Sequence, residues 1–244
     1  MYKNNNLIIP LCAPIQFSPG KRYKHACPIP PYILGALIGD GCMTDSVTNA
    51  NKIQFTTMDF EIIERFISAG YEIKSSYQKP NNKATSYIIH NPTLIQQLKA
   101  IGLRGHSALN KFIPLQYKYA IIKERKELMQ GLIDTDGYVD KRGHLSFSTI
   151  SFQLAEDIAF IIRSLGGKAT IKKNQAGYKD RSGNYIKCQD VYDVYIMTYF
   201  DPELVSLSRK KQRCHYEYNG GNSLLGKRII DIESIGKKGD AQLL

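Results

Sequence analysis

The chain has 244 residues, 43% of them hydrophobic, so it can bury a sizeable core in one large or two small domains. No apolar run approaches the ~20 residues that span a bilayer, and the N-terminus lacks the apolar core of a secretion signal. We therefore expect an intracellular protein without a membrane partner. Lys and Arg outnumber Asp and Glu by 33 to 22, a net charge of +11, which favours a polyanionic partner such as nucleic acid. The five cysteines form no C-x-x-C pair, which argues against a structural zinc site.

Residues 1–29 are irregular and are predicted to form an N-terminal arm that packs on the surface rather than contacting phosphates. A first unit is expected over residues 30–115. It opens with Pro30-Pro31, a favourable helix start, and its first helix ends at Asp40-Gly41. The elements expected after this helix are strands at about 42–48 and 51–57, a helix from Asp59 to Gly70, a hairpin at 71–77 and 84–90, and a helix from Asn91 to Ile101.

The same order recurs over residues 116–215, so the chain is predicted to be a duplicated αββαββα unit with a period near one hundred residues. The elements expected here are a helix at 124–136, strands at 138–141 and 144–149, a helix from Ser151 to Gly166, a hairpin at 168–174 and 185–197, and a helix from Asp201-Pro202. Residues 216–244 form a C-terminal extension, with a strand expected at 228–236.

The first helix of each unit is apolar and ends in Asp-Gly. Each helix carries small residues four positions apart, which are Gly35 and Gly39 in one and Gly131 and Thr135 in the other. Residues four apart share a helix face, and small side chains there let two backbones approach closely. The two helices should therefore cross side by side and bring Asp40 and Asp136 together at one end.

This placement of two acids is costly. We expect Gly41 and Gly137 to end the helices in a left-handed conformation, which leaves both carboxylates at the negative ends of helix dipoles. The two carboxylates also repel each other. A cation between them would remove the conflict, and Mg²⁺ takes one or two carboxylates together with water and phosphate oxygens.

The two helices resemble the motif of the LAGLIDADG (dodecapeptide) homing endonucleases, two copies in one chain as in monomeric and intein-borne members. The copy from Gly131 to Gly137 is close to the pattern, whereas Ile38 and Gly39 replace the usual acid and alanine of the first copy. The resemblance covers about residues 32–215. It implies an α/β fold of two pseudo-symmetric repeats that form a saddle on double-stranded DNA.

The implied function is site-specific double-strand cleavage of a long asymmetric DNA target by a monomer, leaving 3′ overhangs. The implied cofactor is Mg²⁺, for which Mn²⁺ is expected to substitute, while Ca²⁺ should support binding only. Asp40 and Asp136 would be catalytic and would ligate metal, with backbone carbonyls of Gly39 and Thr135. No Gly-rich phosphate loop is present, so no nucleotide cofactor is expected.

A lysine is expected to support each centre. Lys111-Phe112-Ile113-Pro114 resembles a Lys-x-Ile-Pro segment of intein-borne members in which the lysine is catalytic. Its counterpart is Lys210-Lys211-Gln212-Arg213, in which we choose Lys211 over Lys210. Asp134 is expected to have a structural role.

Basic and polar residues on the predicted strands are the candidates for contacts with DNA, because β-ribbons fit the major groove. They can contact phosphates or base edges, or lie on an ordinary solvated surface. The candidates are Gln54, Lys74, Lys79, Lys83, Arg142, His144, Lys172, Lys173, Lys179, Arg181 and Lys187.

Two other functions stay open. The chain could be a nucleic-acid-binding relative that has lost cleavage, as in maturase-like or regulatory members, although it retains both motif acids. It could also be a protein-splicing element, because Arg228 to Gly236 resembles the strand before the C-terminal splicing blocks of inteins. The terminal His-Asn of inteins is absent and no Cys or Ser begins the chain, so we predict no self-splicing. Intron and intein origins stay open.

Overall fold

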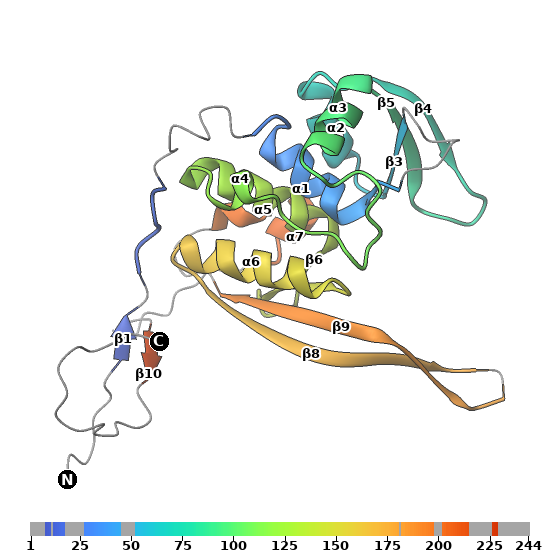
Figure 1. The fold of residues 1–244 in the computed structure, drawn as a ribbon. Coiled ribbons are helices and arrows are strands. Elements are labelled where there is room, and N and C mark those ends of the chain that lie inside the picture. The colour runs from blue at the N-terminus through green and yellow to red at the C-terminus, as the bar shows by residue number, and fades with distance from the viewer. Residues whose placement is uncertain are drawn as a thin grey trace, which may run out of the picture.

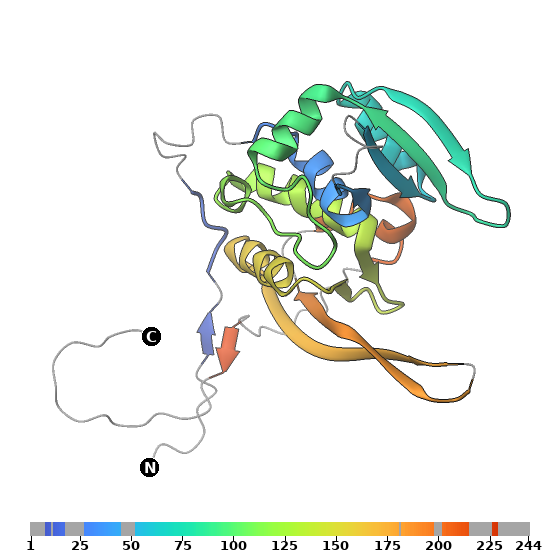
Figure 2. The same ribbon diagram turned by 45° about the vertical axis from the view of Figure 1, so that its right-hand side comes forward.

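The structure, a computed structural model, describes residues 8–10, 12–17, 27–44, 52–180, 182–197, 202–214 and 226–228. Two antiparallel four-stranded sheets lie on either side of two crossing helices (Figures 1 and 2). Their strand orders are β2-β3-β5-β4 and β6-β7-β9-β8, so the second sheet repeats the connectivity of the first. This confirms the predicted α/β fold of two αββαββα repeats.

The first repeat follows its predicted elements to within a few residues, with one exception. The strand expected at 42–48 is found only as a two-residue strand, after which residues 43–44 are irregular and residues 45–51 lie outside the described part of the chain. The elements of this repeat are α1 (Pro31–Asp40), β2 (Gly41–Cys42), β3 (Lys52–Thr57), α2 (Phe60–Ser68), β4 (Ile73–Gln78), β5 (Thr85–His90) and α3 (Pro92–Ala100). The start of α3 was predictable from the sequence because its capping residues are local. The Asn91 side chain accepts a hydrogen bond from the Leu94 amide, and Pro92 takes the first helical position.

A one-turn helix, α4 (Leu115–Lys118), leads into the second repeat. Its elements are α5 (Ile122–Asp136), β6 (Gly137–Val139), β7 (Leu145–Thr149), α6 (Phe152–Ser164), β8 (Lys168–Lys179) and β9 (Tyr185–Met197). The repeat ends in two short pieces, η3 (Pro202–Leu204) and α7 (Ser208–Lys211), instead of the single expected helix. Strand β8 also runs past the expected end at 174, so β8 and β9 form a ribbon longer than β4 and β5 (Figure 1).

The crossing of α1 and α5 is the centre of the molecule, and it depends on missing side chains. A Cβ atom added to Gly35 would lie 2.1 Å from the Leu128 carbonyl oxygen, and one added to Gly131 would lie 2.1 Å from the Tyr32 carbonyl oxygen. The helices therefore touch backbone to backbone, as their glycines predict. Most residues of α1 are buried, and a single apolar cluster includes residues of both repeats.

The ends of these two helices correct one prediction. Gly41 has φ −75° and ψ 132°, and Gly137 has φ −72° and ψ 147°, so neither residue is left-handed. The expectation of a left-handed helix end was wrong because the chain passes straight from each helix into a strand, β2 or β6. Extended backbone at these positions carries the chain away from the helix axis immediately after each aspartate.

The N-terminal segment packs against the second repeat. The Ile15 amide donates to the Ser164 carbonyl at 2.8 Å, and the buried Arg125 guanidinium donates to the Ile15 carbonyl and lies over the Phe17 ring at 4.7 Å. This part of the predicted arm therefore lies against the second repeat. Strand β1 (Ile8–Pro10) pairs antiparallel with β10 (Gly226–Arg228), and most of the extension predicted at 216–244 lies outside the described residues.

None of the helices in the described ranges combines the length and the apolarity that a membrane crossing needs.

Candidate metal centre at the helix crossing

Asp40 and Asp136 end α1 and α5, and the crossing brings their carboxyl groups close enough for each to affect the pKa of the other. Burial desolvates the Asp40 carboxylate, and the negative charge of Asp136 repels it. Both effects disfavour the charged form, so the pKa of Asp40 rises to about 7. Burial likewise raises the pKa of Asp136, which Lys111 and Lys210 oppose. The pair therefore favours a proton or another positive charge beside it, and both acids are exposed to solvent.

The smallest residue is required at the last turn of α1. A Cβ atom on Gly39 would lie 2.0 Å from the Thr135 hydroxyl oxygen and 3.5 Å from a carboxylate oxygen of Asp136. The Thr135 hydroxyl itself turns back and donates to the Gly131 carbonyl of its own helix at 2.9 Å. Gly39 thus lets the ends of the two helices, and with them the two acids, come together.

The donor set fits a small hard cation. Two carboxylates at a solvent-exposed edge, close to backbone carbonyls, match Mg²⁺, which keeps several waters and takes phosphate oxygens. Within the described residues no three His, Cys, Asp or Glu side chains form a group that could hold a metal ion. This arrangement therefore does not resemble a closed zinc site or an all-protein calcium cage.

Lys111 lies at the end of α1, where the sequence predicted it. Its ammonium group donates to the carbonyls of Gly39 at 2.7 Å and Gly41 at 3.5 Å. The side chain is buried, so desolvation lowers its pKa, while Asp136 and Asp40 act in the opposite direction. The lysine thus completes the C-terminus of α1 with a positive charge beside the acid pair.

The corresponding lysine of the second repeat is Lys210. Its buried ammonium group lies within hydrogen-bonding distance of four carbonyls at the end of α5, which are those of Ile133 at 2.7 Å, Asp134 at 2.8 Å, Thr135 at 3.0 Å and Gly137 at 2.6 Å. Desolvation, together with the charge of neighbouring Arg209, lowers the pKa of Lys210 to about 8.

The structure does not bring Lys211, the residue chosen from the sequence, to this place. Lys211 is exposed on α7, which has only one turn and therefore directs consecutive side chains to different sides. One signal could have separated the two lysines. Lys210 lies three residues after buried Leu207, a spacing that puts both on one helix face.

Asp134 has the structural place expected of it. It is buried, accepts a hydrogen bond from the Tyr32 hydroxyl at 3.0 Å and accepts the amides of Ser206 and Leu207 at 3.0 Å each. It thereby fixes the loop that leads into α7. Sequence reasoning missed two other acids near α7, Asp59 and Glu61, which contact residues 150 and 147 positions later in the chain.

The DNA-contact candidates of the first sheet are exposed or partly exposed. Gln54 donates to the Tyr77 hydroxyl at 3.1 Å on the sheet face opposite the buried Ile53 and Phe55. Lys74 pairs with Glu72 at 2.6 Å. Lys79 and Lys83 are exposed at the turn between β4 and β5.

Strand alternation separates two candidates of the second sheet. Lys173 shares a face with the partly buried Ile171 and pairs with Asp190 at 2.7 Å, so it lies on the opposite face from Lys172. Lys172 is exposed opposite Asp193, and Lys187 is exposed on β9. Arg181 and the side chain of Lys179 lie outside the described part of the chain.

Arg142 and His144 lie in a tight turn between β6 and β7. The Asp140 carboxylate accepts the amides of both residues, at 2.8 and 2.9 Å. These two hydrogen bonds, with the charge of His144, lower the pKa of Asp140. The turn therefore presents both side chains to solvent at the edge of the sheet.

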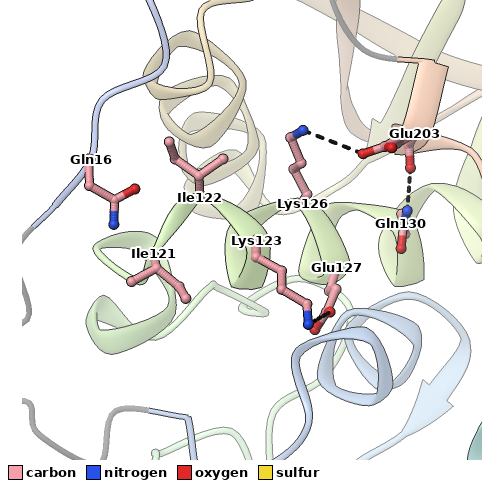
Figure 3. A pocket seen from close by; sticks show the side chains of 8 residues that line it. All are labelled: Gln16, Ile121, Ile122, Lys123, Lys126, Glu127, Gln130 and Glu203. Atoms are coloured by element: carbon pink, nitrogen blue, oxygen red, sulfur yellow. Dashed lines mark hydrogen bonds and ion pairs between the residues drawn. The ribbon is translucent and has the colours of Figure 1, made fainter.

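A hollow of about 530 Å³ lies along the N-terminal half of α5, away from the acids at its C-terminal end (Figure 3). Its lining side chains are Gln16, Ile121, Ile122, Lys123, Lys126, Glu127, Gln130 and Glu203. Lys123 pairs with Glu127 at 3.8 Å, and Lys126 pairs with Glu203 at 3.5 Å (Figure 3). The polar groups of this hollow largely satisfy one another.

Comparison with known proteins gives matches of several kinds. The chain is 30% identical over 209 residues to the replicative DNA helicase DnaB of Mycobacterium intracellulare, which covers 85% of this chain but only 30% of the helicase. It is 35% identical over 78 residues to the homothallic switching endonuclease of Saccharomyces cerevisiae, which covers 30% of this chain and 13% of that protein. The chain thus spans less than a third of the length of these curated relatives.

Solved structures with a similar fold include I-DmoI in complex with DNA and Ca, with a TM-score of 0.48 and 14% identity, covering 78% of this chain and 97% of that one. Full-length DUF199/WhiA from Thermatoga maritima has a TM-score of 0.47 and 11% identity, covering 78% and 59%.

Residues 113–213 match the family model described as homing endonuclease. This span contains α5, the second helix that ends in Asp-Gly. The first repeat has the same strand connectivity and ends its own helix, α1, with Asp40. Over residues 113–213 the chain is therefore similar to the homing endonuclease family.

Proposed function

We propose that the chain is a site-specific double-strand DNA endonuclease that uses a divalent metal. The observation that carries this proposal is the placing of Asp40 beside Asp136 at the end of the helix crossing, where burial raises the pKa of both acids and the charge of Asp136 raises that of Asp40 further. A protein gains nothing in stability from such a pair, so its presence favours a role in holding a cation.

The proposed reaction is hydrolysis of one phosphodiester in each DNA strand. The chemistry that Mg²⁺ would supply here is a lower pKa for a bound water and an offset to negative charge on the phosphate. Asp40 and Asp136 would hold the ion with the carbonyls of Gly39 and Thr135, and Mn²⁺ should replace it, whereas Ca²⁺ should permit binding only. The ammonium groups of Lys111 and Lys210 lie beside the acids, where they can stabilise charge that develops on a phosphate oxygen.

The double-stranded DNA would lie across the two sheets. One chain carries two repeats and two acid-lysine sets, so a monomer can supply one set for each strand. Two offset cuts would leave the 3′ overhangs expected of the family. The direct test is to incubate the protein and Mg²⁺ with a plasmid library of randomised sites and to sequence the linear products. Specific binding without linear product would contradict the proposal.

The two lysines of α7 allow a sharp comparison. Lys210→Met should lower the cleavage rate by about 10² to 10³-fold, because it removes a positive charge from the site. Lys211→Met should leave the rate within about twofold, because that side chain is exposed on the surface of α7. Cleavage rates at saturating enzyme would be measured, with circular dichroism as a check on folding. Equal losses in the two variants would remove Lys210 from the site.

DNA affinity should fall steeply with salt. If six to ten of the basic side chains contact phosphates, affinity should drop by about 10³ to 10⁵-fold between 50 and 200 mM salt, because each contact releases counterions. Fluorescence anisotropy with a labelled duplex in Ca²⁺ would measure this slope. A flat response would show that the basic sheets do not hold DNA.

A cleavage-inactive binding protein is the second candidate function, and the plasmid assay separates the two. The origin of the chain is a separate question. The match to DnaB spans most of this chain and less than a third of the helicase, as expected of an element inserted into a host protein. This coverage supports an intein-borne over an intron-borne origin, and the sequence of the surrounding gene would test it.

A further inference from the structure

We propose that each repeat positions the lysine that serves the other repeat's aspartate. This inference rests on the proposed function, because it assigns roles in cleavage. It concerns four side chains that act through a neighbour rather than by touching DNA phosphate. These positioning residues are Asp59 and Glu61 of the first repeat and Ser151 and Asp157 of the second.

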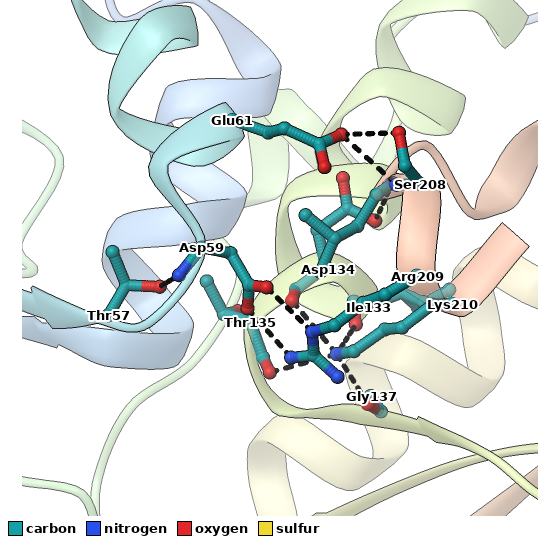
Figure 4. A network of polar contacts seen from close by, with 11 residues as sticks. Thr57, Asp59, Glu61, Ile133, Asp134, Thr135, Gly137, Ser208, Arg209 and Lys210 are labelled. Atoms are coloured by element: carbon teal, nitrogen blue, oxygen red, sulfur yellow. Dashed lines mark hydrogen bonds and ion pairs between the residues drawn. The ribbon is translucent and has the colours of Figure 1, made fainter. Parts of the chain in front are cut away.

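The first half of the arrangement holds α7. The Arg209 guanidinium binds Asp59 through two hydrogen bonds of 2.6 and 2.7 Å, and Glu61 accepts both the amide and the hydroxyl of Ser208 at 3.1 and 2.7 Å (Figure 4). A bidentate contact between a guanidinium and a carboxylate fixes the relative orientation of the two groups as well as their distance. Since Lys210 follows Arg209 directly, these contacts set where its ammonium group enters the end of α5.

The second half holds the segment of Lys111. The Ser151 hydroxyl donates to the Lys111 carbonyl at 2.6 Å, and Asp157 accepts the Ile113 amide at 2.8 Å. Both groups are buried, Ser151 just before α6 and Asp157 on it, and Asp157 also binds the Lys118 ammonium at 2.7 Å. The chain on either side of Ile113 is therefore attached to the second repeat, although Lys111 serves the end of α1 in the first.

One positioning residue from each half occupies a matching place in its repeat. Asp59 and Ser151 each precede the second helix of their repeat, and each amide donates to the hydroxyl of a threonine two residues earlier, Thr57 or Thr149, at 3.1 Å. Asp59 makes no hydrogen bond that caps its own helix and binds Arg209 instead. Different chemistry at equivalent positions does the same task, which favours a shared role over a chance contact.

Removing the contacts that position one lysine should therefore slow cleavage of one DNA strand and leave cleavage of the other strand nearly unchanged. The substrate would be a plasmid that carries a site selected from a randomised pool, with each strand labelled separately. Asp59→Asn or Arg209→Lys should slow one strand by about tenfold to a hundredfold and let nicked circles accumulate. Ser151→Gly should slow the opposite strand.

Two matched variants serve as controls. Glu127→Gln removes one member of an exposed ion pair on α5, and Asn91→Gly removes the capping side chain of α3, as Ser151→Gly removes that of α6. Glycine retains most of the capping preference, so both N-cap changes should cost little stability. Both controls should cut the two strands at the wild-type ratio.

The strand ratio also separates positioning from folding, because an unfolded molecule cuts neither strand. If Asp59→Asn and Ser151→Gly slow the same strand, slow both strands equally, or slow neither while the wild type cuts, the positioning role is wrong. A wild-type protein that cuts no selected site would instead overturn the proposed function.

Discussion

Asp136→Asn, and likewise Asp40→Asn, should abolish double-strand cleavage while DNA binding is retained. An amide keeps the shape of the carboxyl group but removes the negative charge that would hold a divalent cation. Each variant would be assayed for linear product with Mg²⁺ and for affinity by anisotropy with Ca²⁺. Glu127→Gln, which removes a charge elsewhere on α5, should cut normally. Cutting at the wild-type rate by either Asp variant would remove the metal assignment.

Asp40→Asn should also alter the pH dependence of the free energy of unfolding. The pKa of Asp40 is 3.8 in an ordinary environment and about 7 in the folded protein, so the folded state binds its proton more tightly. In EDTA, the free energy of unfolding should therefore fall as pH rises from about 4 to 7. Asp40→Asn should weaken this slope, and Mg²⁺ should raise the melting temperature of the wild type near pH 8 but not that of the Asp40→Asn, Asp136→Asn double variant. A metal response in that double variant would place the cation elsewhere.

Gly35→Ala and Gly131→Ala should each destabilise the fold severely. The added methyl group would lie 2.1 Å from a carbonyl oxygen of the facing helix, so α1 and α5 would have to separate. Overpacking of this kind costs about 3 kcal/mol, and the helix propensity of alanine returns only about 1 kcal/mol. Chemical denaturation would measure the loss. Cleavage should fall further than stability, because separation also moves Asp40 from Asp136.

Gly70→Ala provides the matched control for these glycines. Gly70 has φ +83° with no heavy atom within 4 Å of an added Cβ, so its cost of about 1 kcal/mol comes from backbone strain alone. Losses at Gly35 and Gly131 no greater than this would show that the helices can move apart easily, and the close crossing would then not be required.

Local patterns predicted much of this fold. Alternating apolar residues marked the strands, Asn91-Pro92 marked a helix start, and the spaced glycines predicted the helix crossing. These signals were sufficient because each depends on neighbours within a few residues. The length of β8 was underestimated, because Gly177 lies in it and interrupts the strand pattern, yet it pairs with Lys187 after a register shift.

The parts of the site that failed prediction depend on contacts between distant segments. Lys210 and Lys211 are the same residue type on a helix of one turn, and only the end of α5 distinguishes them. Asp59 precedes α2 like an ordinary capping residue, and its partner Arg209 is 150 residues away. The glycines after the two acids look like ordinary helix ends, whereas each opens a strand.

The two outer ribbons differ in reach. Strands β8 and β9 have 12 and 13 residues, whereas β4 and β5 have six each. At about 3.3 Å per residue, the longer ribbon extends roughly 20 Å farther from the crossing, which corresponds to about six base pairs of duplex. On a bound duplex, the scissile phosphates would then lie away from the midpoint of the covered DNA. The protein would therefore bind its DNA in one orientation, with more base pairs covered on the side of β8 and β9.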